Sequence, residues 1–120
     1  MSVSQAQSII KPVIAYTEFE KLDIRVGTIV EASAQSWSKK LLRFTVDFGG
    51  ELGKRVIFAG IQRWYTPDTF IGKQFCFLIN LEPKKMGEEE SQGMMIMADE
   101  EESPIVIPLS QQVPNGTIVR

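Results

Sequence analysis

The sequence predicts an all-β fold, a small antiparallel barrel with short flanking helices. Its 120 residues suffice for one domain, and 43% of them are hydrophobic, as in folded soluble domains. Apolar and polar residues alternate with a period of two in several short runs, which is the pattern of strands with one buried face. Turns that contain glycine or proline separate these runs at intervals typical of small barrels. We expect residues 1–16 to form an N-terminal tail and residues 17–120 to form the domain.

One or two helical turns are expected at residues 17–22, followed by a strand from Ile24 to Glu31. Thr17 can supply an N-cap hydroxyl, and Phe19 and Leu22 are spaced to share one helix face. From Ile24 onward the period changes to two, which places alternate side chains on opposite faces of a strand.

The next two strands are expected to form a hairpin. Residues 41–48 alternate strictly, and Gly49 to Gly53 supply a turn into residues 54–59. The apolar face of the first of these strands consists of Leu42, Phe44, Val46 and Phe48.

The remaining sequence predicts a short helix and three more strands. Residues 62–72 contain Pro67 and several aromatic side chains, and this segment suits a helix that plugs one end of the sheet. Strands are expected at residues 75–80, 94–98 and 105–107, which completes a six-stranded barrel.

Composition excludes several kinds of chemistry. The chain has no His and one Cys, so Ser-His, Cys-His and zinc sites are excluded. Cys76 lies in an apolar run and is interpreted as a reduced core thiol. We therefore expect no enzyme activity, no cofactor and no metal. The chain has no 18-residue apolar run and no signal-peptide pattern, so we expect a cytoplasmic protein without membrane association.

The charges are distributed unevenly along the chain. Residues 1–85 carry 12 of the 13 basic residues and 8 of the 15 acidic residues, a net charge of +4. Residues 86–120 carry one basic and seven acidic residues, a net charge of −6. The first part can therefore present a basic face to an anionic partner, although the total charge is −2.

Several segments, in the same order along the chain, resemble the motifs of the tRNA-binding domain family. They are Phe19–Gly27, Lys40–Leu42 with Val46–Gly49, Asn80–Met86, Ser91–Met94 and Val113–Thr117. This family includes the C-terminal domain of methionyl-tRNA synthetase, stand-alone structure-specific tRNA-binding proteins and CsaA-type chaperone-like proteins. The resemblance covers residues 17–120 and implies a barrel of the oligonucleotide/oligosaccharide-binding (OB) type, which uses one curved face for nucleic acid.

Basic residues and the family motifs together give a set of candidate RNA-binding residues. Pro83 fixes a turn that aims Lys84 and Lys85 outward as phosphate partners, and the lysine before Met86 is a recurrent tRNA-contact position in the family. Lys40 matches a family lysine that opens the second strand. The full candidate set is Lys40, Arg43, Asn80, Lys84, Lys85, Ser91 and Met94.

Three of these candidates have alternative interpretations or rest on the resemblance alone. The Asn80 amide can pin the turn that follows it or can meet a base or ribose edge. Met94 can pack against a base or point into the core, since alternate residues of its strand face inward. The family resemblance implies that the Ser91 hydroxyl reaches a phosphate or a sugar.

The sequence departs from the family pattern between Met86 and Ser91. Many relatives carry a basic residue there, whereas this chain has Gly87 followed by Glu88, Glu89 and Glu90. Three carboxylates beside a contact loop would repel phosphates. The run therefore points away from the RNA, or weakens its binding, or indicates another ligand.

The resulting expectation is a non-catalytic protein that recognises the shape and backbone of tRNA. The resemblance implies a homodimer and an accessory role beside methionyl-tRNA synthetase. The alternative is a CsaA-like chaperone or peptide-binding module, for which an acidic C-terminal third would be natural.

Overall fold

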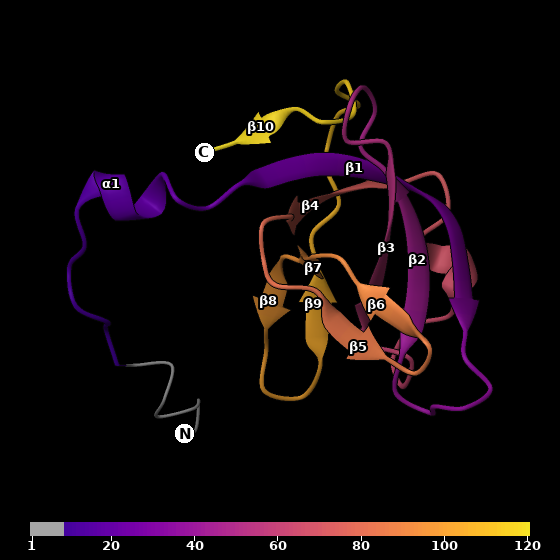
Figure 1. Ribbon diagram of the computed structural model, residues 1–120. Coiled ribbons are helices and arrows are strands. Elements are labelled where there is room, and N and C mark those ends of the chain that lie inside the picture. Colours follow the sequence, from indigo (N-terminus) through magenta and orange to yellow (C-terminus); the bar gives the residue numbers. More distant parts are fainter. Residues whose placement is uncertain (1–8) are drawn as a thin grey trace.

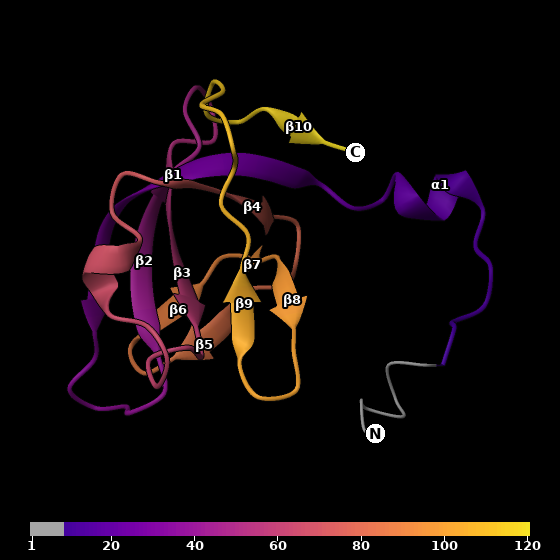
Figure 2. The ribbon, with the colours of Figure 1, turned by 180° about the vertical axis from the view of Figure 1, so that it is seen from behind.

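The computed structural model describes residues 9–120, and its centre is a six-stranded antiparallel sheet that curls into a nearly closed barrel (Figures 1 and 2). The strand order is β3-β2-β1-β4-β7, and β10 also pairs with β1. These strands are β1 (Ile24–Ala34), β2 (Leu42–Asp47), β3 (Lys54–Ala59), β4 (Gln74–Leu78), β7 (Met94–Met95) and β10 (Ile118–Val119). The predicted all-β barrel is confirmed.

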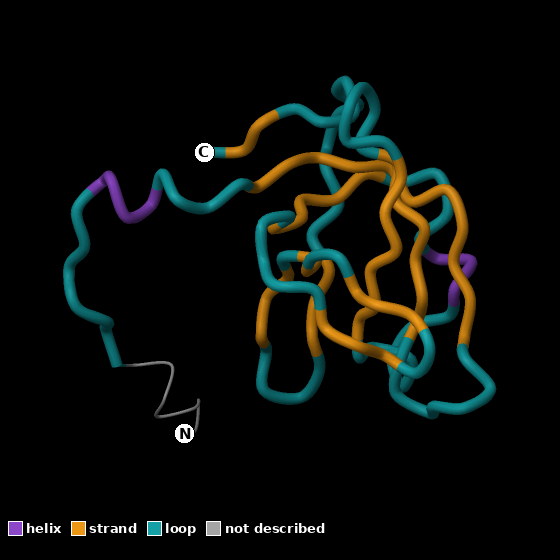
Figure 3. The backbone as a smooth tube through the Cα atoms, viewed as in Figure 1, coloured by secondary structure: helices purple, strands orange, loops and turns teal. Residues whose placement is uncertain are grey.

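Two small hairpins and two short helices complete the fold (Figure 3). One hairpin joins β5 (Lys84–Met86) to β6 (Glu89–Ser91), and the other joins β8 (Met97–Asp99) to β9 (Pro104–Val106). The helices are α1 (Tyr16–Phe19) and the 3₁₀ helix η2 (Pro67–Thr69). Within residues 9–120, no helix is long and apolar enough to cross a membrane.

The long strand β1 is the centre of the sheet because it pairs with three other strands. Its first half pairs with β4 and β10, and its second half continues along β2. A register shift between Ile29 and Glu31 interrupts the ladder to β2. Such a bulge bends a strand, which lets one strand follow the curvature of a small barrel. It also breaks the simple alternation that the sequence predicts for this segment.

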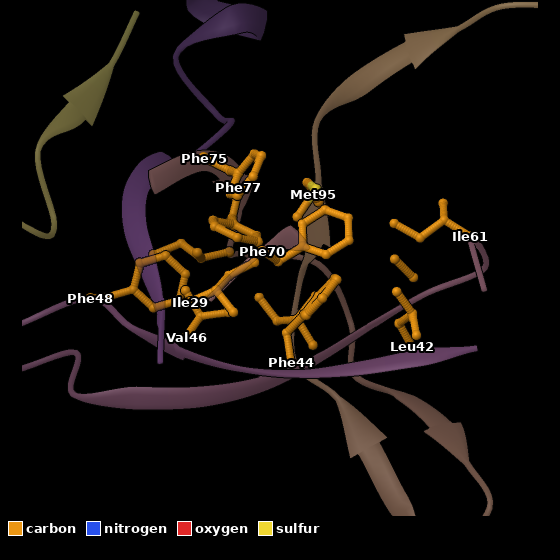
Figure 4. Close-up of a cluster of buried hydrophobic side chains, with 13 residues drawn as sticks. Ile29, Leu42, Phe44, Val46, Phe48, Ile61, Phe70, Phe75, Phe77 and Met95 are labelled. Atoms are coloured by element: carbon orange, nitrogen blue, oxygen red, sulfur yellow. The ribbon is translucent and has the colours of Figure 1, made fainter. Parts of the chain in front are cut away.

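The core is filled mainly by β2 and by aromatic side chains from other elements (Figure 4). The apolar face of β2 that the sequence predicts is confirmed, since its side chains are all buried. Phe70, which follows η2, packs between Phe44 and Phe75 with ring centroids 4.9 and 5.6 Å away. The segment around η2 therefore plugs the barrel, as the sequence predicts.

The free edge of β3 is closed by the last residue of β6 and the residue that follows it. The Gln92 amide N–H donates to the Val56 carbonyl at 2.8 Å, and the Val56 N–H donates to the Gln92 side chain at 3.0 Å. The Phe58 N–H donates to the Ser91 hydroxyl at 2.9 Å. These bonds satisfy edge groups that would otherwise be unpaired, and they complete the wall of the barrel.

Local details differ from the sequence-based expectation. Helix α1 begins at Tyr16 with Ala15 as its N-cap, so Thr17 lies inside the helix and makes no cap. The strand expected at 94–98 is divided at Ile96, because β7 pairs with β4 whereas β8 pairs with β9. The β5–β6 hairpin and β10 are additional to the expected strands.

The N-terminal segment extends away from the barrel (Figures 1 and 2). The first eight residues of the expected tail lie outside the described residues. From residue 9 to α1 the chain exposes large apolar side chains, with Ile10 93% and Val13 98% exposed. Within the described chain, the large apolar side chains of this segment are therefore mostly exposed to solvent.

Gly27 provides a test of the packing. An added Cβ there would lie 2.5 Å from Val46 Cγ1 and 2.8 Å from Phe48 Cε1, inside the core. We expect Gly27→Ala to lower the free energy of unfolding by about 1–3 kcal/mol, as overpacking does. Gly60→Ala is the matched control, because a Cβ at Gly60 meets nothing within 4 Å. Urea denaturation of both variants measures the difference, and equal stabilities would contradict the close approach.

Candidate nucleic-acid interface

The β5–β6 hairpin lies against the outer side of β2 and β3, and its two faces differ in chemistry. Its cross-strand pairs are Lys84 with Ser91, Lys85 with Glu90 and Met86 with Glu89. Because side chains alternate along a strand, the first and third pairs face the barrel and the second faces solvent. The hairpin thus presents the exposed Lys85 outward, beside a carboxylate on the neighbouring strand. The expectation that both lysines point outward holds for Lys85 alone, because Lys84 lies on the barrel side of the hairpin.

The loop between β1 and β2 reaches this hairpin through Trp37. The Trp37 ring lies 6.2 Å from the Phe58 ring and covers Gly87 at the hairpin turn. A Cβ on Gly87 would lie 2.8 Å from the indole, and its φ of +65° also favours glycine. The same loop carries the exposed Lys39 and Lys40, so loop and hairpin form one continuous surface.

A hollow of about 360 Å³ lies between the hairpin and the barrel wall. Phe58, Leu81, Met86 and Met94 contribute its apolar lining, and Lys84 lies on its wall. Met94 is half-exposed here, whereas the neighbouring Met95 is buried in the core. The structure therefore places Met94 on the surface. Of the two positions that the sequence allowed, the core position is excluded.

Two of the predicted site residues hold the backbone together. The Ser91 hydroxyl accepts from the Phe58 N–H and is only 5% exposed. The Asn80 side chain accepts from the Asp23 N–H at 2.9 Å and donates to the Lys21 carbonyl at 2.6 Å. Asn80 therefore joins the end of β4 to the turn before β1, which is the pinning role that the sequence allowed.

Arg43 extends from β2 to an ion pair with the hairpin. Its Nε and Nη2 donate to the two carboxylate oxygens of Glu89 at 2.6 and 2.8 Å. These hydrogen bonds raise the pKa of Arg43 and lower the pKa of Glu89. The pair is therefore intact at neutral pH and is lost only as the pH falls through the lowered pKa of Glu89. The Glu89 carboxylate thus occupies the two guanidinium nitrogens of Arg43 to which a phosphate would otherwise bind.

The remaining candidates are the exposed lysines. Lys40, Lys84 and Lys85 form no ion pair with any residue of the described chain, and the contact through Trp37 brings their segments together. By contrast, Arg25 and Arg55 donate to backbone carbonyls. The surface thus offers mobile ammonium groups, which suit phosphates as point charges.

The sequence-based candidate set omits the aromatic part of this surface. Trp37 lies in a polar stretch of sequence, and Phe58 belongs to a strand with no obvious alternation. Their pairing links two segments distant in sequence. Within residues 9–120, no group of three or more His, Cys, Asp or Glu side chains is arranged to hold a metal. Cys76 is only partly buried and lies outside the core cluster, so its interpretation as a core thiol is wrong. Partial burial raises the pKa of its thiol, which keeps it protonated at neutral pH.

A family model described as a putative tRNA binding domain matches residues 24–118. The chain is 40% identical over 107 residues to the methionine–tRNA ligase of Porphyromonas gingivalis, covering 88% of this chain and 15% of that protein. It is 42% identical over 110 residues to the enzyme of Methanothrix thermoacetophila, covering 92% of this chain and 16% of that protein. The chain thus spans about a sixth of the length of these curated relatives.

Solved structures show the same architecture. A MetRS-related protein from Pyrococcus horikoshii superposes with a TM-score of 0.85 at 37% identity, covering 92% of this chain and all of that one. The chaperone CsaA from Bacillus anthracis superposes with a TM-score of 0.80 at 27% identity, covering 91% of this chain and all of that one.

The role of Ser91 can be tested by removing its hydroxyl. Ser91→Ala leaves the buried Phe58 N–H without its acceptor, so we expect the free energy of unfolding to fall by about 1–3 kcal/mol. The amide of Phe58 should also exchange faster with deuterium. Ser110→Ala, at an exposed serine, is the control and should change neither quantity. A Ser91→Ala protein as stable as the wild type would exclude the closing role.

Proposed function

Because this chain belongs to the tRNA-binding domain family, we propose that it binds tRNA through the surface formed by the β5–β6 hairpin and the loop 35–41. The observation that carries the proposal is a set of lysines on this surface that form no ion pair with residues 9–120, namely Lys39, Lys40, Lys84 and Lys85. Recognition of RNA by shape uses cations against phosphates and needs no catalytic group. The protein therefore binds without performing a reaction of its own.

The similarity to methionine–tRNA ligases supports an accessory role in aminoacylation. The matched region makes up a small part of two methionine–tRNA ligases. We propose that this domain holds tRNA for a methionyl-tRNA synthetase in the cytoplasm, whether joined to that enzyme or separate from it. The domain would increase the local concentration of tRNA near the catalytic part.

We further propose that the protein is a homodimer joined through its N-terminal segment. This segment exposes Ile9, Ile10, Val13, Ile14 and Tyr16 in sequence, and Ile118 on the neighbouring β10 is half-exposed. A contiguous apolar surface of this kind is typical of an interface. A two-fold axis here would bury both segments and would duplicate the lysine surface.

The alternative function is a CsaA-like chaperone or peptide-binding module. The apolar hollow and the similarity to the chaperone CsaA favour it. The two functions differ in salt dependence, because phosphate contacts release counterions whereas apolar contacts do not. Electrophoretic titration with total tRNA at two salt concentrations, beside an unfolded polypeptide, discriminates them. If the protein binds the polypeptide at both salt concentrations and does not bind tRNA, the chaperone-like function replaces the proposed one.

Lys84→Ala combined with Lys85→Ala should weaken binding to all tRNAs alike. The slope of log affinity against log salt should become shallower by about 0.7–0.9 for each phosphate that the variant no longer neutralises. The control removes two exposed lysines outside the surface, as Lys54→Ala with Lys73→Ala. If both double variants show the same fall in affinity, Lys84 and Lys85 act only through net charge.

The acidic run can be dissected residue by residue. Replacing Glu88, Glu89 and Glu90 together by Gln should raise tRNA affinity about tenfold or more at low salt. Glu89→Gln alone should also steepen the salt slope by about 0.7–0.9, because it frees Arg43 for a phosphate. Glu88→Gln removes a charge without freeing a cation, so it should leave the slope nearly unchanged. Identical slopes for the two single variants would show that Arg43 does not reach the RNA.

The dimer can be tested by light scattering at tens of micromolar. The wild type should have the mass of two chains, and Val13→Asp with Ile14→Asp should have the mass of one. Ile71→Asp changes an exposed apolar residue outside the N-terminal segment and should remain dimeric. A wild-type protein with the mass of one chain would exclude the dimer.

A further inference from the structure

The turn that follows β3 carries a stacked pair of side chains that the proposed lysine surface does not include. The Arg63 guanidinium lies over the Trp64 ring, 5.1 Å from its centroid. Trp64 is 41% exposed, so this large aromatic surface reaches solvent. Aromatic rings and guanidinium planes are the surfaces on which unpaired bases stack in protein–RNA complexes.

This turn is joined to the loop that carries Lys39 and Lys40. The Gln62 N–H donates to the Lys40 carbonyl at 3.0 Å. The Gln62 side-chain amide, oriented to satisfy its neighbours, donates to the Ser38 and Leu41 carbonyls at 3.0 and 2.9 Å. The loop thus contacts the hairpin through Trp37, and its following residues, from Ser38 to Leu41, contact this turn.

Hydrogen bonds within the turn and to the first residue of β9 also fix it in place. The Trp64 and Tyr65 amides both donate to the Ile61 carbonyl, at 3.0 and 3.1 Å, and Ile61 is buried in the core. The Tyr65 hydroxyl donates to the Pro104 carbonyl at 2.9 Å. A stacking surface that is already fixed loses little conformational freedom when a ligand binds.

The charge of the pair favours an anionic partner. Arg63 forms no ion pair among the residues that the structure describes, and neither do Lys39 and Lys40 on the adjoining loop. A nucleotide brings both a flat base and a phosphate, so it satisfies the ring, the guanidinium and the ammonium groups together.

We propose that Arg63 and Trp64 form a base-stacking platform for an unpaired nucleotide of the bound RNA. The proposal rests on the proposed tRNA binding and extends that surface beyond the loop 35–41 to the turn that follows β3. It also states which part of a tRNA lies here, namely a loop or an end with an unstacked base, and not a paired stem.

Fluorescence gives a direct readout, because the chain has two tryptophans, Trp37 and Trp64. Trp37→Phe keeps an aromatic ring beside Phe58, and in this protein the emission comes from Trp64 alone. Because Trp37 belongs to the proposed surface, electrophoretic titration with tRNA first checks that this protein still binds. Total tRNA should quench this emission as it binds, whereas a fully paired RNA duplex should not. This measurement leaves the platform intact and does not depend on whether variants at Trp64 fold.

Affinity provides the second readout. Trp64→Leu should weaken tRNA binding about fivefold or more at both low and high salt, since base stacking is sequence-tolerant and not ionic. Arg63→Gln should weaken binding and make the salt slope shallower. Lys54→Gln removes an exposed cation at the far end of β3 and should have little effect.

The outcomes separate this platform from the tRNA binding on which it rests. If the Trp37→Phe protein binds tRNA with no change in Trp64 emission, and Trp64→Leu binds as the wild type does, the platform is wrong and tRNA binding stands. If quenching is equal for tRNA and for paired duplex, the site does not read unpaired bases. If the wild type binds no tRNA, both proposals are wrong.

Discussion

The closure of the β3 edge by Ser91 and Gln92 is the constraint on which the candidate surface depends. An edge strand must satisfy its N–H and C=O groups or remain open to other chains. Here a hydroxyl and an amide side chain supply the missing partners, so Ser91 and Gln92 are fixed against Phe58 and Val56. Because Ser91 ends β6, the same bonds position the whole β5–β6 hairpin. That position forms the hollow between the hairpin and the barrel and places Lys84 on its wall. It also brings Glu89 within hydrogen-bond distance of Arg43.

Polar side chains are divided between two tasks in this domain. Arg25, Arg43, Arg55, Asn80 and Ser91 are all engaged in hydrogen bonds within the chain. The lysines of the loop and hairpin are not paired within the described chain. Guanidinium and amide groups make directional bonds that fix structure, whereas ammonium groups on flexible stems suit contacts with a phosphate backbone of variable geometry.

The predictability of each part follows from how local its signal is. The buried face of β2 depends only on alternation within one strand, so the sequence predicts it fully. The bulge in β1 arises from pairing with strands far along the chain, and local alternation cannot reveal it. The β5–β6 hairpin is hidden because three consecutive glutamates resemble a solvated loop. Asn80 and Ser91 have the polar chemistry of contact residues, and only tertiary structure shows that backbone groups already occupy them.

The pairing of β10 with the first residues of β1 gives the domain two poles with different uses. Both ends of the chain leave the barrel beside Ile24 and Arg25, whereas the loop 35–41, the hairpin and the Arg63–Trp64 turn gather near the last residues of β1. An 11-residue strand spans at most about 35 Å. A catalytic body or a second copy attached at the first pole would lie at the opposite end of β1 from the surface proposed for RNA. Changes at the first pole can then alter tethering without altering the surface proposed for RNA at the second.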